Sequence, residues 1–393
     1  MARSEVPFDA FAGDPVVVSD QCVNAGFRGA GCTRCADICP VKAITIRPGA
    51  TLLDPGTCMR CGACLPTCPT EAIGARSPDR RLHFALADVP RRSAVVIVCA
   101  RDATASWSLP VLRHDRCLAA LGAEELLDLA GEAERDLWLD DSACSTCDLG
   151  QLWTAIAVAV RDGNALRQTL GLGPLLHLTT DEAVPAAGAR LTPAIESRGG
   201  AMSRRGVFRR LVDEVSERFT LHSAGTAPPR RRQRVLARLR AWRPPPVVTT
   251  ATVSVAGFGH VTIDHDRCSA CGLCARFCPT GSLTFLETAN EHGDRAFSLA
   301  THPAACVACG LCTVACPDAA LTLEPRVDPA ALLADSTETL TTGLLTSCQI
   351  CGVATAGSDG ASARCFSCRR GVVSPVRDEV GLMADLLGRL PHG

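Results

Sequence analysis

Short, regularly spaced cysteine runs constrain this chain more than any other feature. Its 393 residues include 24 cysteines, and two runs with the spacing C-x2-C-x2-C-x3-C-P occupy residues 268–279 and 306–317. A chain of this length can bury a core without disulfide staples, so clustered thiols indicate metal sites in a reducing cytoplasm. Cysteines at this spacing let one tight loop offer three soft thiolates to a single centre. The fold is therefore expected to be built around metal-binding loops.

The second half of the chain resembles a bacterial dicluster ferredoxin, because residues 255–325 carry two complete runs in tandem. In that family the fourth cysteine of each run binds the cluster of the other run. The resemblance implies one 4Fe–4S cluster on Cys268, Cys271, Cys274 and Cys316, and a second on Cys306, Cys309, Cys312 and Cys278. Two strands are expected at 283–286 and 296–299, around a turn at 291–294. Zinc knuckles are the alternative, but they use paired C-x2-C units instead of tandem triplets.

The N-terminal region repeats this pattern with one departure. Its complete run implies, by the same crossover, a third cluster on Cys58, Cys61, Cys64 and Cys39. The preceding run has Gly29 where its first cysteine would stand. Cys22 is the unassigned cysteine nearby, and the glycine-rich residues 24–31 can fold back, so a fourth cluster is expected on Cys22, Cys32, Cys35 and Cys68. A three-iron cluster and a degenerate site are the alternatives.

Between these two regions, apolar runs alternate with helical patterns. Strands are expected at 94–98, 137–139 and 175–178, and helices at 124–135 and 152–170, which is the βαβαβ order of a small parallel sheet. Sites in open parallel sheets form at the carboxyl ends of the strands. Cysteines follow the first two strands there, and a further cysteine precedes the first helix. They predict a fifth iron–sulfur site, 2Fe–2S or 4Fe–4S, on Cys99, Cys117, Cys144 and Cys147.

Alternatives stay open for this middle region. Cys99 and Cys117 could be buried core thiols, which would leave only the C-x2-C pair as special. His114 could replace a cysteine as a ligand, although a surface histidine beside Asp115 and Arg116 is the more ordinary interpretation. The arrangement resembles the delta subunit of methyl-viologen-reducing hydrogenases, with a different cysteine spacing.

The last cysteine module contains two C-x2-C pairs and resembles a zinc ribbon. It predicts one zinc ion, or rubredoxin-like iron, on Cys348, Cys351, Cys365 and Cys368. A hairpin turn is expected at 357–360 between the two pairs. With this module counted, every cysteine belongs to a group of four, and none remains as an obvious nucleophile.

An arginine-rich segment joins the middle region to the second ferredoxin-like region. Residues 202–219 are a candidate amphipathic helix, and residues 228–246 are a linker with many arginines. Such a run is usually a solvated helix face. A docking surface for an acidic redox partner is the alternative.

These features predict an α+β multidomain protein with two dicluster ferredoxin domains flanking a parallel-sheet domain. The expected boundaries are 1–88 and 251–326 for the ferredoxin domains, 89–200 for the sheet domain, 201–250 for the linker and 327–393 for the zinc-ribbon-like domain with a C-terminal helix. The formal net charge of −1 argues against nucleic-acid binding. No apolar run approaches the length of about 18 residues that a membrane span needs.

Neither a nucleotide-binding loop nor a paired-carboxylate signature marks a substrate pocket. The ferredoxin resemblance therefore implies a cytoplasmic polyferredoxin that passes electrons to redox partner proteins. We expect it to be the electron-wiring subunit of an oxidoreductase such as a hydrogenase or a molybdenum-dependent dehydrogenase. One alternative is a reductase whose open iron binds substrate. Another is an iron–sulfur carrier or assembly factor that uses the ribbon for docking.

Overall fold

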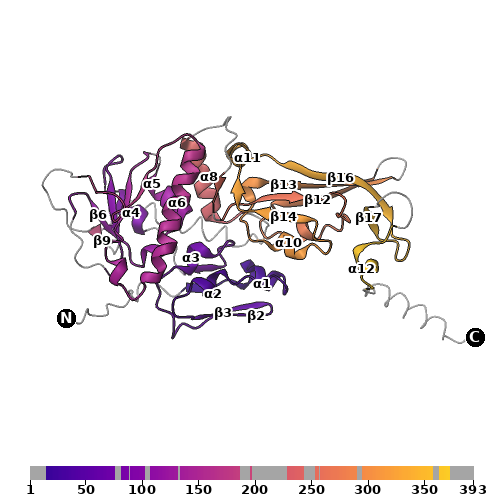
Figure 1. The fold of residues 1–393 in the computed structure, drawn as a ribbon, viewed down its shortest axis with the longest axis horizontal. Coiled ribbons are helices and arrows are strands. Elements are labelled where there is room, and N and C mark those ends of the chain that lie inside the picture. The colour runs from indigo at the N-terminus through magenta and orange to yellow at the C-terminus, as the bar shows by residue number, and fades with distance from the viewer. Residues whose placement is uncertain are drawn as a thin grey trace, which may run out of the picture.

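The computed structural model describes residues 15–75, 81–87, 89–101, 107–131, 133–185, 195–196, 228–242, 253–255, 257–289, 294–356 and 363–371. The described parts form an elongated molecule (Figure 1). The parallel sheet lies at one end and the C-terminal cysteine module at the other, with the two ferredoxin-like units between them. The candidate helix at 202–219 and the expected turn at 357–360 lie outside the described residues, as do residues 291–293 of the other turn.

The N-terminal unit is built from two short antiparallel ladders and three one-turn helices. Strand β1 (Pro15–Val17) pairs with β4 (Ile73–Ala75), and β2 (Ile44–Arg47) pairs with β3 (Ala50–Leu53). The helices are α1 (Val23–Gly26), α2 (Arg34–Ile38) and α3 (Cys64–Thr67). Four of its cysteines are buried with Ile44 and Ile73 in one small core. So few apolar side chains make a small core, and the cysteines are a large part of it.

The middle domain is a five-stranded parallel sheet in the order β8-β7-β5-β6-β9. Its strands are β5 (Val95–Val98), β6 (Val111–Arg113), β7 (Leu137–Leu139), β8 (Leu176–Leu178) and β9 (Ile195–Glu196). Every residue of β5 is fully buried, because both faces of the sheet are covered. The parallel sheet expected from the sequence is thus present, and it also contains β6 and β9, which were not expected.

Helices α4 (Arg81–Ala87), α5 (Ala123–Ala130) and α6 (Trp153–Thr169) contribute to the core of this domain. The helix expected at 124–135 ends five residues earlier, at Ala130, where Gly131 adopts a positive φ of 71°. A positive φ favours glycine and ends an α-helix.

Helix α8 (Arg230–Trp242) packs against the same core through Val235, Leu236 and Leu239, which share one helix face. The expectation of a solvated arginine face is wrong for part of this helix. The Arg232 side chain is only 2% exposed and ion-paired to Glu124. Buried guanidinium groups require such partners, so α8 is an internal element that joins the modules.

The second ferredoxin-like unit repeats the first and carries a longer sheet. Strand β10 (Val253–Ser254) pairs with β15 (Arg326–Val327), and β11 (His260–Ile263) pairs with β14 (Leu321–Glu324). Its helices are α9 (Leu273–Arg276), α10 (Leu311–Ala315) and α11 (Pro329–Ala334). The antiparallel sheet joins β12 (Leu283–Ala289), β13 (Arg295–Thr301), β16 (Glu338–Ser347) and β17 (Ala354–Ala356).

Both strands expected between the cysteine runs are therefore present and longer than expected. The long strand β16 carries the chain from this sheet to the C-terminal cysteine module, which ends with α12 (Phe366–Arg369). The remaining short 3-10 helices are Ser19–Gln21, Leu118–Ala120, Cys144–Thr146, Gly150–Leu152 and Pro303–Ala305. Among the described helices, none has the length and apolar character needed to cross a membrane.

Candidate metal centres

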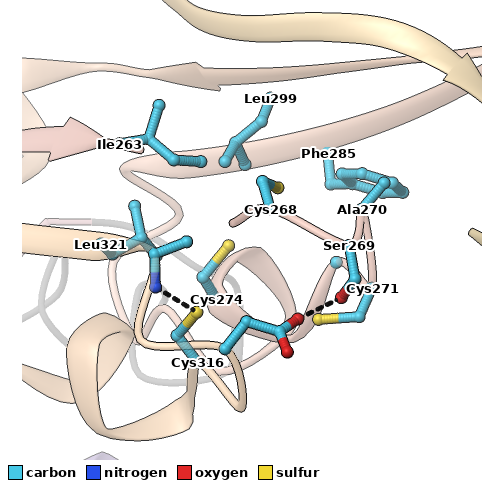
Figure 2. Close-up of a pocket in the computed structure, with 13 residues that line it drawn as sticks. Ile263, Cys268, Ser269, Ala270, Cys271, Cys274, Phe285, Leu299, Cys316 and Leu321 are labelled. Atoms are coloured by element: carbon cyan, nitrogen blue, oxygen red, sulfur yellow. Dashed lines mark hydrogen bonds between the residues drawn. The ribbon is translucent and has the colours of Figure 1, made fainter. Parts of the chain in front are cut away.

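The second ferredoxin-like unit contains two small cavities, and each is lined by four cysteines. Figure 2 shows the first cavity, which is lined by three cysteines of one run and the last cysteine of the other. We name these four residues the far quartet: Cys268, Cys271, Cys274 and Cys316. The second cavity is lined by the last cysteine of the first run and three cysteines of the second run. We name these four residues the near quartet: Cys278, Cys306, Cys309 and Cys312. The crossed grouping implied by the ferredoxin resemblance is thus the grouping that lines these cavities.

Backbone conformation at two glycines lets the ligand loops close around these cavities. Gly272 and Gly310 have φ values of 68° and 81° and directly precede α9 and α10. Only glycine adopts this left-handed conformation without strain, so each C-x2-C-x2-C loop can turn sharply into its helix. The backbone N–H of Ala320 donates to the Cys316 Sγ at 3.3 Å. Such N–H···S bonds stabilise thiolate charge.

The N-terminal unit repeats this geometry in the regular quartet: Cys39, Cys58, Cys61 and Cys64. The backbone N–H of Ala43 donates to the Cys39 Sγ at 3.3 Å, at the same offset as in the second unit. Burial raises the pKa of the Cys64 thiol to about 12, and the neighbouring Cys61, Cys58 and Cys39 add to the rise. Cys39 and Cys64 lie in one buried core cluster, and Cys58 packs against it.

The irregular first cysteine run is completed by a loop that brings Cys22 back towards three other cysteines. We name this group the loop quartet: Cys22, Cys32, Cys35 and Cys68. Asn24, which is 5% exposed, fixes this return. Its Nδ2 donates to the Cys32 carbonyl at 2.8 Å, and its Oδ1 accepts from the Cys32 N–H at 3.0 Å. Burial raises the pKa of the Cys35 thiol to about 12, and Cys68, Cys32 and Cys22 raise it further. Cys22 packs against the core cluster that contains Cys35 and Cys68, so the loop returns it to these cysteines, and its role as the fourth ligand stays a prediction.

The middle quartet lies at the carboxyl ends of β5 and β7: Cys99, Cys117, Cys144 and Cys147. Burial raises the pKa of the Cys144 thiol to about 12, and Cys99, Asp141 and Cys147 raise it further. The pKa of Cys117 is likewise raised to about 12 by burial, then by Cys99, Cys61 and Cys144. Cys117 belongs to the core of the middle domain, and Cys99, Cys144 and Cys147 pack against that core. The fifth metal site on these four cysteines stays a prediction.

The neighbouring His114 is not the surface residue that its charged neighbours suggested. Its side chain is 2% exposed, and Asp115 and Arg116 are buried as well, at 4% and 1%. The His114 Nε2 lies 3.8 Å from an Asp115 carboxylate oxygen. The polar sequence suggested an exposed turn, but these three residues directly follow β6 and are covered by the N-terminal ferredoxin-like unit. Arg116 donates to the carbonyl of Arg60, in that unit, at 3.3 Å.

The C-terminal module forms the ribbon quartet: Cys348, Cys351, Cys365 and Cys368. Its four sulfur atoms lie within 4.8 Å of one another, and no other group of three or more possible ligands is so compact within the described ranges. Four thiolates placed tetrahedrally about 2.3 Å from one ion lie about 3.8 Å apart. The Cys351 and Cys365 Sγ atoms lie 3.6 Å apart, so this spacing fits a single zinc or iron ion. Backbone bonds from Cys348 N–H to the Val353 carbonyl and from Gly352 N–H to the Cys348 carbonyl close the first knuckle.

The chemistry of the quartets fits iron–sulfur clusters in the ferredoxin-like units. All 24 cysteines are free thiols. Several buried thiols at one cavity ionise together only when a cation compensates their charge, and thiolate is the ligand that iron–sulfur clusters require. The wider spacing of these quartets than of the ribbon quartet suits a cluster of several irons instead of one ion.

Sequence reasoning missed the arginines that contact the ligand loops. Arg231 donates to the Leu65 and Cys68 carbonyls at 2.8 and 2.9 Å, and Arg232 donates to the Cys306 carbonyl at 2.7 Å. Arg34 donates to the Ala308 carbonyl. An unusual arginine density in residues 230–240 was the one available signal, and charge density alone does not say whether a helix faces solvent or protein.

Comparison with known proteins places the same two regions in one family. Residues 29–72 match a 4Fe–4S dicluster domain, and residues 261–284 match a 4Fe–4S binding domain. A ferredoxin from Alicyclobacillus acidocaldarius is 37% identical over 59 residues, which cover 15% of this chain and 69% of that protein. A ferredoxin from Rickettsia felis is 36% identical over 63 residues, covering 16% of this chain and about half, 53%, of that protein.

A third relative extends over more of the chain. A protein described as an uncharacterized ferredoxin from Methanocaldococcus jannaschii is 28% identical over 115 residues, 29% of this chain and 62% of that protein. The paired cysteine cavities and these matches agree on 4Fe–4S binding. The chain therefore belongs to the ferredoxin family of 4Fe–4S proteins.

Proposed function

We propose that this iron–sulfur protein is a polyferredoxin that carries electrons along its length, as the wiring subunit of a larger oxidoreductase such as a hydrogenase or a molybdenum-dependent dehydrogenase. Four 4Fe–4S clusters would be held by the loop, regular, near and far quartets. The middle quartet would hold a fifth cluster, and the ribbon quartet a zinc or iron ion. Each bound cluster supplies a one-electron couple, whose potential depends on its surroundings.

The adjacency of the quartets is the observation that carries this proposal. Cys117 of the middle quartet and Cys61 of the regular quartet are buried in one core cluster. Cys64 of the regular quartet shares a second cluster with Cys35 of the loop quartet, and Cys312 of the near quartet shares a third with Cys274 of the far quartet. Electron transfer between one-electron carriers requires that their sites lie close together. An isolated active site would not require this repetition.

The chain's own residues supply insulation and stability for such a path. Apolar side chains surround the quartets in both ferredoxin-like units. At the far end, the ribbon is fastened beside the far quartet, since the Ala356 N–H and the Thr355 hydroxyl both donate to the Ser269 carbonyl. Each quartet offers four thiolates, which leaves no open iron position for substrate. This favours a carrier of electrons over the reductase alternative.

Metal analysis and a redox titration of the anaerobically purified full chain test the proposal. Four clusters, with or without a fifth, predict about 16 to 20 irons and one zinc per chain, and reversible reduction with retention of all iron. Fewer than about 12 irons after full reconstitution would contradict the four-cluster count. Transfer of iron and sulfide to an apo-ferredoxin acceptor would favour the carrier or assembly function instead.

A further inference from the structure

Three arginines lie where the two ferredoxin-like units meet, and each of them donates to a backbone carbonyl of a ligand loop. Arg231 and Arg232 are neighbours on α8, and their guanidinium groups reach ligand residues of different units. Arg231 contacts the carbonyl of Cys68, in the loop quartet, and Arg232 contacts the carbonyl of Cys306, in the near quartet. Since consecutive Cα atoms are about 3.8 Å apart, this pair of contacts holds ligand loops of the two units at adjacent residues of one helix.

Arg34 crosses the same boundary from the N-terminal unit. It lies between Cys32 and Cys35 in sequence, and it donates to the carbonyl of Ala308, which lies between Cys306 and Cys309. Beside it, the rings of Phe27 and Phe277 are in contact, with centroids 4.8 Å apart. Thus a side chain from the ligand loop of one quartet touches the ligand loop of the other, with aromatic packing at the same boundary.

At this junction the carboxylates of Glu71 and Glu124 are paired with the two arginines of α8. Arg231 faces Glu71 at 3.2 Å and Glu124 at 3.8 Å, and Arg232 faces Glu124 at 2.7 Å. These two carboxylates offset two guanidinium groups. Arg34 donates to a neutral carbonyl, so that contact leaves its charge uncompensated. Its guanidinium group lies against both ligand loops, because Arg34 stands between Cys32 and Cys35 and reaches the carbonyl that lies between Cys306 and Cys309.

We propose that the arginine junction, formed by Arg34, Arg231 and Arg232, is where an electron crosses between the two ferredoxin-like units, and that Arg34 stabilises the added negative charge at both flanking quartets. The inference rests on the proposed electron-carrying function. The electron lost on one side is the one gained on the other, with no bond broken and no proton transferred. Arg34 is a positioning and tuning residue, because it acts on the centres through their ligand loops.

The test is Arg34→Gln in the full chain, with each centre followed by electron paramagnetic resonance during a redox titration. Signals are assigned beforehand with Cys22→Ser for the loop quartet and Cys309→Ser for the near quartet. At a fixed potential near the midpoint, the ratio of reduced to oxidised centre should fall at least about threefold at these two quartets. The far and regular quartets should keep their potentials, and iron content should be unchanged.

Two further variants separate charge from contact. Arg34→Lys keeps the charge without the guanidinium, so it should restore both potentials. Arg267→Gln removes an exposed arginine beside Cys268, so it should leave the loop and near quartets unaffected. If Arg34→Gln loses iron, Arg34→Met, which removes the charge and keeps much of the side-chain length, takes its place.

Unchanged potentials in an iron-replete Arg34→Gln protein would overturn the inference, and so would a shift that lysine does not reverse. Both results would leave the proposed function standing, provided that the unmodified protein is reduced and reoxidised reversibly. A wild-type protein whose centres do not titrate reversibly would instead overturn the proposed function, and this inference with it.

Discussion

Replacing Asn24 by alanine should release the iron of the loop quartet selectively. Asn24 holds the returning loop through two hydrogen bonds to the backbone of Cys32, at 2.8 and 3.0 Å, from a buried position. Each bond contributes about 1 kcal/mol, and a buried N–H left without a partner adds to the cost. The closed loop should therefore lose about 2 to 3 kcal/mol of stability relative to open conformations. This loss corresponds to an increase of about 30- to 150-fold in the equilibrium constant for loop opening.

The assay is anaerobic release of iron to a ferrous chelator, followed over time. If opening of the loop limits release, about one quarter of the ferredoxin-type iron should leave about 30 to 150 times faster in Asn24→Ala than in wild type. Thr33→Ala is the matched control, since Thr33 lies in the same segment and its hydroxyl donates to Asp37 at an exposed site. Its release kinetics should match wild type.

Two results would refute this reasoning. Equal release kinetics for Asn24→Ala and Thr33→Ala would show that Asn24 does not limit loop opening. Faster release from a different quartet, identified by its resonance signal, would show that Cys22 is not held at the site that its position suggests.

Three further predictions concern the remaining sites. Cys22→Ser should damage only the loop quartet, because serine oxygen is a harder ligand than thiolate, giving a three-iron or weakened cluster; iron content and spectra identical to wild type would make Cys22 a bystander. Replacing Cys144 and Cys147 by serine should remove one spectroscopic signal and spare the four ferredoxin-type signals, whereas unchanged metal content would make these cysteines structural. Reconstitution of the apo-protein should release protons, because the Cys35 and Cys64 thiols have pKa values raised to about 12 and so are protonated at neutral pH. Metal affinity should then rise with pH across the range below about 12, and a pH-independent affinity measured in weakly buffered solution would contradict these shifts.

The sequence by itself determined the cysteine runs and the broad order of the modules. Ligands two or three residues apart must share one loop, so spacing alone defines three members of the regular, near and far quartets and two members of the loop quartet. The alternation of apolar runs with helical patterns identified the parallel sheet for a similarly local reason. A fully buried strand such as β5 has to be apolar at every position.

Only the tertiary structure decided how the modules meet. The Arg34 contact joins residues 274 positions apart, and the contact of Arg232 with Cys306 joins residues 74 positions apart. No sequence pattern encodes such pairs, because they depend on how preformed units pack. The same reason explains why His114 is buried and why α8 faces protein instead of solvent. Local spacing sets what each loop can bind, and packing between distant segments sets which loops become neighbours.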